Sequence, residues 1–92
     1  MTHYVKIEKE YFVLNEQRKK FWEIRYNDRN YKTGDDICLI EYDPSKPGYT
    51  ERCVTCQIEY VMYEFEGLED GYVIMSLTRK PTIDSTMFNL NQ

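Results

Sequence analysis

The stretch KKFWEIRYNDRNYKTGDD, residues 19–36, decides the expected fold because it joins an alternating strand to a polar loop. In its first half a large apolar face alternates with a charged one: Trp22, Ile24 and Tyr26 against Glu23 and Arg25. We expect the apolar face to be buried and the charged pair to lie together in a concave, partly exposed site. The second half predicts a loop, because Asn, Asp and Gly favour turns.

The rest of the chain predicts one short helix and four more strands. Residues 3–7 alternate as a half-buried strand does, and residues 8–17 have helical spacing with acidic residues in the first turn. Further strands are expected at residues 36–43, 50–63 and 72–77, separated by turns at residues 44–49 and 64–71. In the long strand, parity places Val54, Cys56, Ile58, Tyr60 and Met62 on one face and Cys53, Thr55, Gln57 and Glu59 on the other.

The length and composition predict a single small domain. The chain has 92 residues, of which 41% are hydrophobic and nine are tyrosines, enough for one compact core. We assign this domain to residues 1–79 and a C-terminal tail, which opens with a strand-breaking proline, to residues 80–92. No apolar run approaches the roughly 20 residues of a membrane span, and the N-terminus lacks the features of a secretory signal. We therefore expect a cytoplasmic protein.

The three cysteines predict reduced thiols, since an odd number is a poor basis for a disulfide framework. Cys53 and Cys56 form a CxxC, a spacing found in some zinc and redox sites. On a strand, residues three apart point to opposite faces, so these two thiols are not expected to meet. We predict no metal site and no cofactor.

The charges are segregated along the chain. The net charge of −4 argues against a general coat for nucleic acid, yet residues 18–32 carry six basic and two acidic side chains. Residues 35–70 are strongly acidic. A local basic patch on an acidic body suits a selective anionic ligand better than a long duplex. A solvated charged surface is the alternative interpretation.

Several short motifs follow one another in a fixed order. RKKFWEIR at residues 18–25 matches GxKxxExR in its lysine, glutamate and arginine, and NDR, GD, EY, YTER and GLEDGYVIMSL follow at residues 27–29, 34–35, 41–42, 49–52 and 67–77. Together they resemble the ASCH domain of the PUA-like β-barrel superfamily, particularly its small stand-alone branch in bacteria and phages. The resemblance covers residues 2–79. Arg18 and Glu51 replace glycines of the family motifs, and a side chain at position 18 is expected to alter the site geometry.

The resemblance implies an α+β fold, a five-stranded PUA-like β-barrel with one short helix packed at its mouth. It also implies a cleft between helix and barrel mouth that binds RNA or a modified nucleoside. The implied nucleic-acid-binding residues are Lys20, Glu23, Arg25, Asn27, Asp28, Arg29, Tyr49 and Arg52. Arginine offers a planar fork of donors to phosphate or to a guanine edge, and lysine is a compact cation toward phosphate. Tyr31, Tyr49 or Trp22 can stack on a base, as single-stranded RNA recognition favours.

Three other interpretations are compatible with these residues. A salt-bridge network between Glu23 and the neighbouring arginines explains the charges without a ligand. Some ASCH-like proteins are amidohydrolases acting on an acylated cytidine, with a threonine where Glu23 stands; Lys20 would then be the base or nucleophile, with Thr33 and Thr50 as nearby hydroxyls. A protein partner is the third interpretation. We favour binding over catalysis and assign no catalytic residue.

Overall fold

The computed structural model describes residues 1–46 and 49–79, without the side chains of residues 49–51. These residues form five strands and one helix: β1 (Thr2–Glu8), α1 (Lys9–Glu16), β2 (Trp22–Tyr26), β3 (Asp36–Tyr42), β4 (Tyr49–Met62) and β5 (Tyr72–Arg79). The predicted helix and strands are therefore confirmed. The predicted tail, residues 80–92, and part of the predicted turn at residues 44–49 lie outside the described residues.

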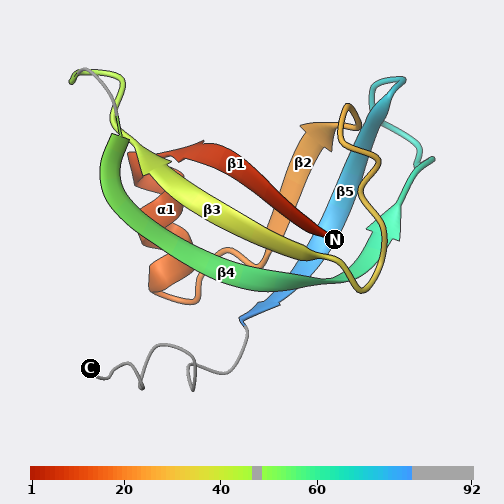
Figure 1. Cartoon of the computed structure of the whole chain (residues 1–92). Helices are drawn as coiled ribbons and strands as arrows, with labels where there is room; N and C mark the ends of the chain where they lie inside the picture. Colours follow the sequence, from red (N-terminus) through yellow and green to blue (C-terminus); the bar gives the residue numbers. More distant parts are fainter. Residues whose placement is uncertain (47–48, 80–92) are drawn as a thin grey trace.

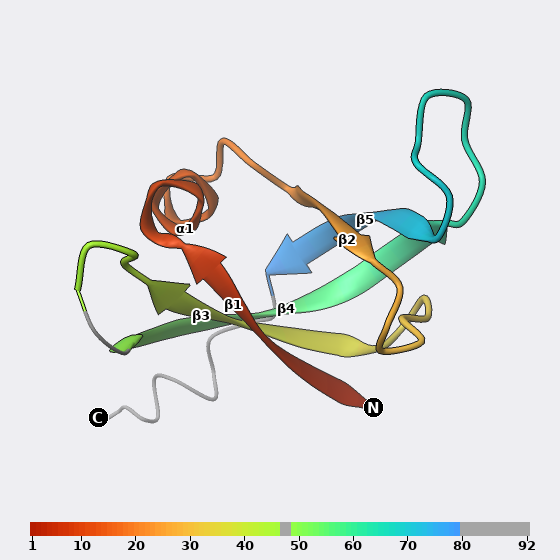
Figure 2. The ribbon, with the colours of Figure 1, turned by 90° about the horizontal axis from the view of Figure 1, so that it is seen from above.

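The five strands form one curled sheet in the order β1-β3-β4-β5-β2, which leaves β1 and β2 as its edges (Figure 1). β1 runs parallel to β3, and the other neighbouring pairs are antiparallel. Seen from above, β1 and β2 lie on two sides of an open space, with α1 at one end of it (Figure 2). The sheet is thus a half-barrel, and the predicted closed barrel is wrong. β1 and β2 do not pair with each other, so the sheet does not close on itself.

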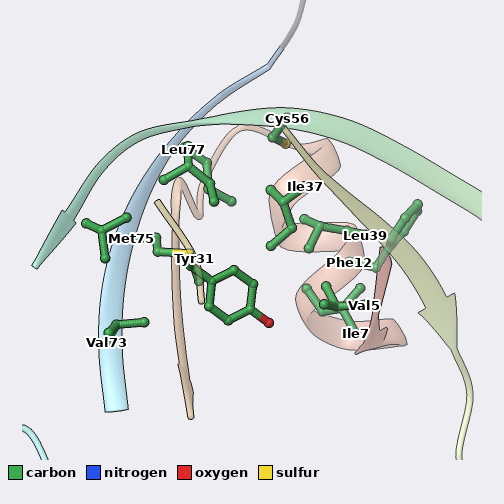
Figure 3. Close-up of a cluster of buried hydrophobic side chains, with 12 residues drawn as sticks. Val5, Ile7, Phe12, Tyr31, Ile37, Leu39, Cys56, Val73, Met75 and Leu77 are labelled. Carbon is green, nitrogen blue, oxygen red and sulfur yellow. The ribbon is translucent and has the colours of Figure 1, made fainter. Parts of the chain in front are cut away.

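The core lies on the concave side of the sheet and is covered by α1 (Figure 3). Its members come from α1, from four of the strands and from the loop after β2: Val5, Ile7, Phe12, Tyr31, Ile37, Leu39, Cys56, Ile58, Val61, Val73, Met75 and Leu77. Burying one large aliphatic side chain contributes about 1.5–3 kcal/mol. This core holds β1, β3, β4 and β5 together, whereas β2 contributes no member to it.

β2 buries the face opposite to the one predicted. Glu23 is buried, whereas Trp22, Ile24 and Tyr26 are 45%, 52% and 58% exposed. The alternation is confirmed, but the predicted burial of the apolar face is wrong. No described element covers the outer face of β2, where these three side chains lie. The charges on its inner face are paired with one another, which lowers the cost of burying them.

β4 changes its buried face part-way along. Its register with β5 shifts between Ile58 and Tyr60, and beyond that point Val61 is buried while Tyr60 is exposed. An extra residue in a β-bulge reverses the alternation, so the prediction that Tyr60 shares the buried face of Ile58 is wrong. Before the bulge the parity holds: Cys53 is exposed and Cys56 is buried, on opposite faces as predicted.

The C-terminal end of α1 directs the chain toward β2. The N–H of Arg18 donates to the carbonyl of Asn15 at 3.0 Å, and the N–H of Lys19 donates to the carbonyl of Leu14 at 2.9 Å. These two bonds are the Schellman motif, in which the residue after the helix is left-handed. Arg18 has a φ of 61°, in the region that favours glycine. Among the described residues, no helix has the length and apolar character needed to cross a membrane.

Candidate functional site

A cavity of about 710 Å³ opens between the two edge strands, beside α1. This volume lies in the range of sites that hold small ligands. Its lining includes four basic side chains, Lys6, Lys20, Arg25 and Arg29, and three acidic ones, Glu8, Glu23 and Asp28. The remaining lining residues are aromatic or aliphatic: Tyr11, Trp22, Tyr26, Tyr31, Tyr72, Val5, Ile7 and Ile24. The cavity therefore combines an excess of one basic side chain with several aromatic rings.

Glu23 lies at the centre of an ion-pair network in this cavity. Its Oε2 accepts a hydrogen bond from Lys20 Nζ at 2.6 Å, and its Oε1 accepts one from Arg25 Nε at 2.9 Å. Lys20 Nζ also donates to the carbonyl of Trp22 at 2.6 Å and lies 5.8 Å from the centroid of the Tyr11 ring. Because both carboxylate oxygens bind cationic donors, Glu23 fixes the positions of Lys20 and Arg25.

Arg25 spans the space between the two edges of the sheet. Its Nη2 donates to the carbonyl of Lys6 in β1 at 2.8 Å, while its Nε binds Glu23. The register of β1 explains why this carbonyl is available. The N–H of Asp36 donates to the carbonyl of Met1, so odd-numbered residues of β1 bond to β3 and even-numbered ones point away. One side chain thus bridges two strands whose backbones do not pair.

β2 presents backbone groups to the same space. The N–H of Leu77 donates to the carbonyl of Phe21, and the N–H of Asn27 donates to the carbonyl of Gly71. In the antiparallel register these bonds mark odd-numbered residues of β2 as the ones that bond to β5. The N–H and C=O of Ile24 therefore point away from β5, toward the cavity that Ile24 lines.

The loop after β2 brings Asp28 and Arg29 to the cavity. The side-chain oxygen Oδ1 of Asn27 accepts a hydrogen bond from the N–H of Tyr31 at 2.9 Å, which folds the loop into a compact turn. Arg29 is exposed, and no hydrogen bond or ion pair joins it to another described residue. Its guanidinium is therefore the basic group of this cavity with the most hydrogen-bonding capacity left for a ligand.

Tyr31 is the least exposed residue of the cavity lining, at 1%. Its ring packs in a tilted orientation against His3, with centroids 4.8 Å apart, and its carbonyl accepts a hydrogen bond from the Tyr63 hydroxyl at 2.7 Å. Burial raises the pKa of the Tyr31 phenol, an effect that the nearby guanidinium groups of Arg25 and Arg29 oppose. The phenol is therefore neutral and protonated at neutral pH.

The structure brings five of the eight sequence-predicted site residues to the cavity: Lys20, Glu23, Arg25, Asp28 and Arg29. Asn27 does not line it but supports the loop through the N–H of Tyr31. Arg52 does not line it either, because its guanidinium pairs with Glu16 and Glu41. The side chains of Tyr49 and of the candidate hydroxyl Thr50 lie outside the described residues.

The other candidate hydroxyl does not reach the cavity. Thr33 Oγ1 accepts a hydrogen bond from the N–H of Val61 at 3.2 Å and is absent from the described lining. Sequence reasoning missed six lining residues that lie far from the KxxExR segment: Val5, Lys6, Ile7, Glu8, Tyr11 and Tyr72. Lys6 and Glu8 are two residues apart and therefore share one face of the first strand, and this shared charged face was a signal present in the sequence. It could not be used without knowing that β1 and β2 are the two edges of one sheet.

Comparisons with known proteins identify the family. The model of a domain of unknown function, DUF3850, matches residues 2–77, which include the whole cavity lining. The chain belongs to the DUF3850 family. A similar protein is the "uncharacterized 12.9 kDa protein in GpA 3′region" of Escherichia phage P2, which is 37% identical over 93 residues. That alignment covers 94% of this chain and 84% of the phage protein. The DUF3850 match therefore extends from β1 nearly to the end of β5.

Proposed function

We propose that this DUF3850 chain is an RNA- or nucleotide-binding module of the ASCH type within the PUA-like superfamily. The ligand binds in the cavity between β1 and β2, where the KxxExR and NDR segments meet. The architecture supports the ASCH-type assignment, because the helix follows the first strand and the motif lies between that helix and β2. Arg18 is left-handed at the position where GxKxxExR has glycine, which supports the same alignment.

The observation that carries the proposal is that Glu23 binds two basic side chains of the cavity and leaves a third available. Lys20 and Arg25 are held by Glu23, whereas Arg29 lines the same cavity and binds no described residue. A preorganised pair of cations beside an available guanidinium suits a phosphate or a base edge. Aromatic rings at the opening, with Trp22 and Tyr26 about half exposed, suit the stacking of unpaired bases.

The proposal is tested by the binding of fluorescently labelled single-stranded RNA, followed by anisotropy. Arg29→Ala should weaken binding by roughly tenfold, since a charge-assisted hydrogen bond contributes about 1.5 kcal/mol. Lys46→Ala is the matched control, because Lys46 is an exposed cation that does not line the cavity, and its affinity should be unchanged. Arg29 is exposed and forms no hydrogen bond or ion pair with a described residue, so this variant should fold normally.

Salt dependence separates a specific site from general charge attraction. The logarithm of affinity falls as the logarithm of salt concentration rises. Arg29→Ala should make this fall less steep by roughly one unit of slope, because one fewer counterion is released. Equal weakening in the Arg29 and Lys46 variants would contradict the proposal. Complete absence of RNA and nucleotide binding by the native chain would contradict it as well.

The amidohydrolase alternative has weaker support. It requires a nucleophile or a base in the cavity, yet both oxygens of Glu23 are engaged by cationic donors and Lys20 Nζ donates to two acceptors. An amine nitrogen whose protons are donated to a carboxylate and a carbonyl is directed at those two acceptors and not at a substrate. Release of cytidine from an N4-acylated cytidine that disappears in Lys20→Ala would favour hydrolysis over binding.

A further inference from the structure

The Tyr31 hydroxyl is a buried hydrogen-bonding group without a partner among the described residues. The ring is 1% exposed, and three contacts fix the residue: the His3 ring, the Asn27 side chain and the Tyr63 hydroxyl. All three hold the ring or the backbone and leave the phenolic oxygen unbound. Buried polar groups are costly to leave unpaired, so the burial of this oxygen is easiest to explain by a group that enters the cavity.

The hydroxyl points toward Val5 and Ile7 of β1, which belong to the core and also line the cavity, and away from β5 (Figure 3). Figure 3 shows the oxygen on the side of the ring that faces Val5 and Ile7, away from Val73 and Met75. Val5 and Ile7 line the cavity, as does Tyr31, whereas the two β5 residues do not. A ligand that fills the space between β1 and β2 therefore meets this oxygen.

The charges around the hydroxyl decide which kind of ligand atom it meets. Arg25, Arg29, Glu23 and Asp28 lie close enough to interact with the phenol electrostatically. The Glu23 carboxylate is already bound by Lys20 and Arg25, so the surplus charge at this point is positive. A protonated phenol in a positive environment favours a ligand atom that accepts a hydrogen bond and carries partial negative charge.

We infer that Tyr31 is a specificity-determining residue, whose hydroxyl donates a hydrogen bond to a carbonyl oxygen of the bound nucleobase. The cavity then favours the bases that have a carbonyl group, uracil, guanine and cytosine, over adenine, which has none. This inference rests on the proposed function and names the class of base that the same site selects.

The test compares two variants that each lose one phenolic oxygen. Tyr31→Phe should weaken the binding of labelled hexauridylate by roughly threefold to tenfold, as expected for one hydrogen bond between neutral groups, and leave hexaadenylate binding unchanged. The thermal midpoint of Tyr31→Phe should stay level or rise, because the substitution removes no hydrogen bond between described residues. Tyr63→Phe is the matched control: it loses the bond to the Tyr31 carbonyl, so its midpoint should fall while the preference for uridine persists.

Each result discriminates between the inference and the proposed function. Equal affinity of native protein and Tyr31→Phe for hexauridylate, with Arg29→Ala still weakening it, would overturn the inference and leave the proposed function intact. If Tyr31→Phe weakened hexaadenylate binding as much as hexauridylate binding, the inference would also be overturned, since a general packing role has no base preference. Failure of the native chain to bind either oligonucleotide or a free nucleotide would refute both.

Discussion

At the scale of single residues, Glu23 organises the candidate site. Its carboxylate is buried, while its partners Lys20 and Arg25 reach it from the helix-to-strand turn and from the next inward position of β2. Buried charges are tolerated when they are paired and hydrogen-bonded, and each oxygen of Glu23 has a cationic donor. The Glu23 carboxylate therefore pairs with both cations in the free protein.

Removing this carboxylate should be destabilising. Glu23→Gln leaves Lys20 and Arg25, which are only partly exposed, without their counter-charge, and we expect a loss of about 2–4 kcal/mol in the free energy of unfolding. Urea unfolding measures it. Glu8→Gln is the control, because Glu8 also lines the cavity but is exposed, and its effect should stay within about 0.5 kcal/mol. Similar stability of both variants would show that the network contributes nothing to folding.

A second residue-scale prediction concerns pH. The hydrogen bond with His3, at 2.8 Å, lowers the pKa of the Asp35 carboxyl, and the N-terminal charge acts in the same direction. A carboxyl whose pKa is lower in the folded state stabilises the protein above its unfolded pKa, about 4, and this stabilisation is lost as the pH falls through the folded pKa.

Asp35→Asn should therefore lower the free energy of unfolding by about 1 kcal/mol at pH 7, the size expected for a partly exposed bond to a charged group. The difference from the native protein should narrow below about pH 4. Urea unfolding between pH 2.5 and pH 7 measures both quantities, with exposed Asp70→Asn as a control that changes neither. A difference that stays constant down to the lowest pH would contradict the assignment.

At the scale of elements, the end of α1 carries a conformational cost. Arg18 occupies the left-handed position of a Schellman motif, where a side chain with a Cβ atom costs roughly 1–2 kcal/mol. Arg18→Gly should raise the free energy of unfolding by about 1 kcal/mol and the melting temperature by about 4–8 °C.

The control for this prediction is the adjacent position. Gln17 has a φ of −80°, where glycine has no conformational advantage, so Gln17→Gly should be destabilising by about 0.5–1 kcal/mol. Thermal unfolding of the two variants under identical conditions makes the comparison. A destabilised Arg18→Gly would mean that the arginine side chain contributes more than its backbone conformation costs.

At the scale of the whole molecule, the sheet is open between β1 and β2, and amide hydrogen exchange can detect this. The N–H of Arg25 points toward β5, whereas the N–H of Ile24 points into the cavity. We expect Ile24 to exchange fast and Arg25 slowly, with the core residues Ile37 and Leu39 of β3 the slowest, because β3 pairs on both sides. Exchange resolved by residue with NMR measures this alternation. Equal protection of Ile24 and Arg25 would indicate a closed barrel.

The sequence by itself determined the elements and the local spacing of the site. Period-two and helical patterns depend on nearest neighbours along the chain, so the strands, α1 and the common face of Glu23 and Arg25 follow from residue order alone. The tertiary structure alone decided which face of β2 is buried, because parity separates two faces without saying which one meets the core. It also decided that Tyr60 is exposed, since a one-residue bulge in β4 has no signal in the alternation. Lastly, it brought Lys6, Tyr11 and Tyr72 to the cavity and Arg52 to Glu16, because the order of strands in a sheet depends on long-range pairing that no local pattern encodes.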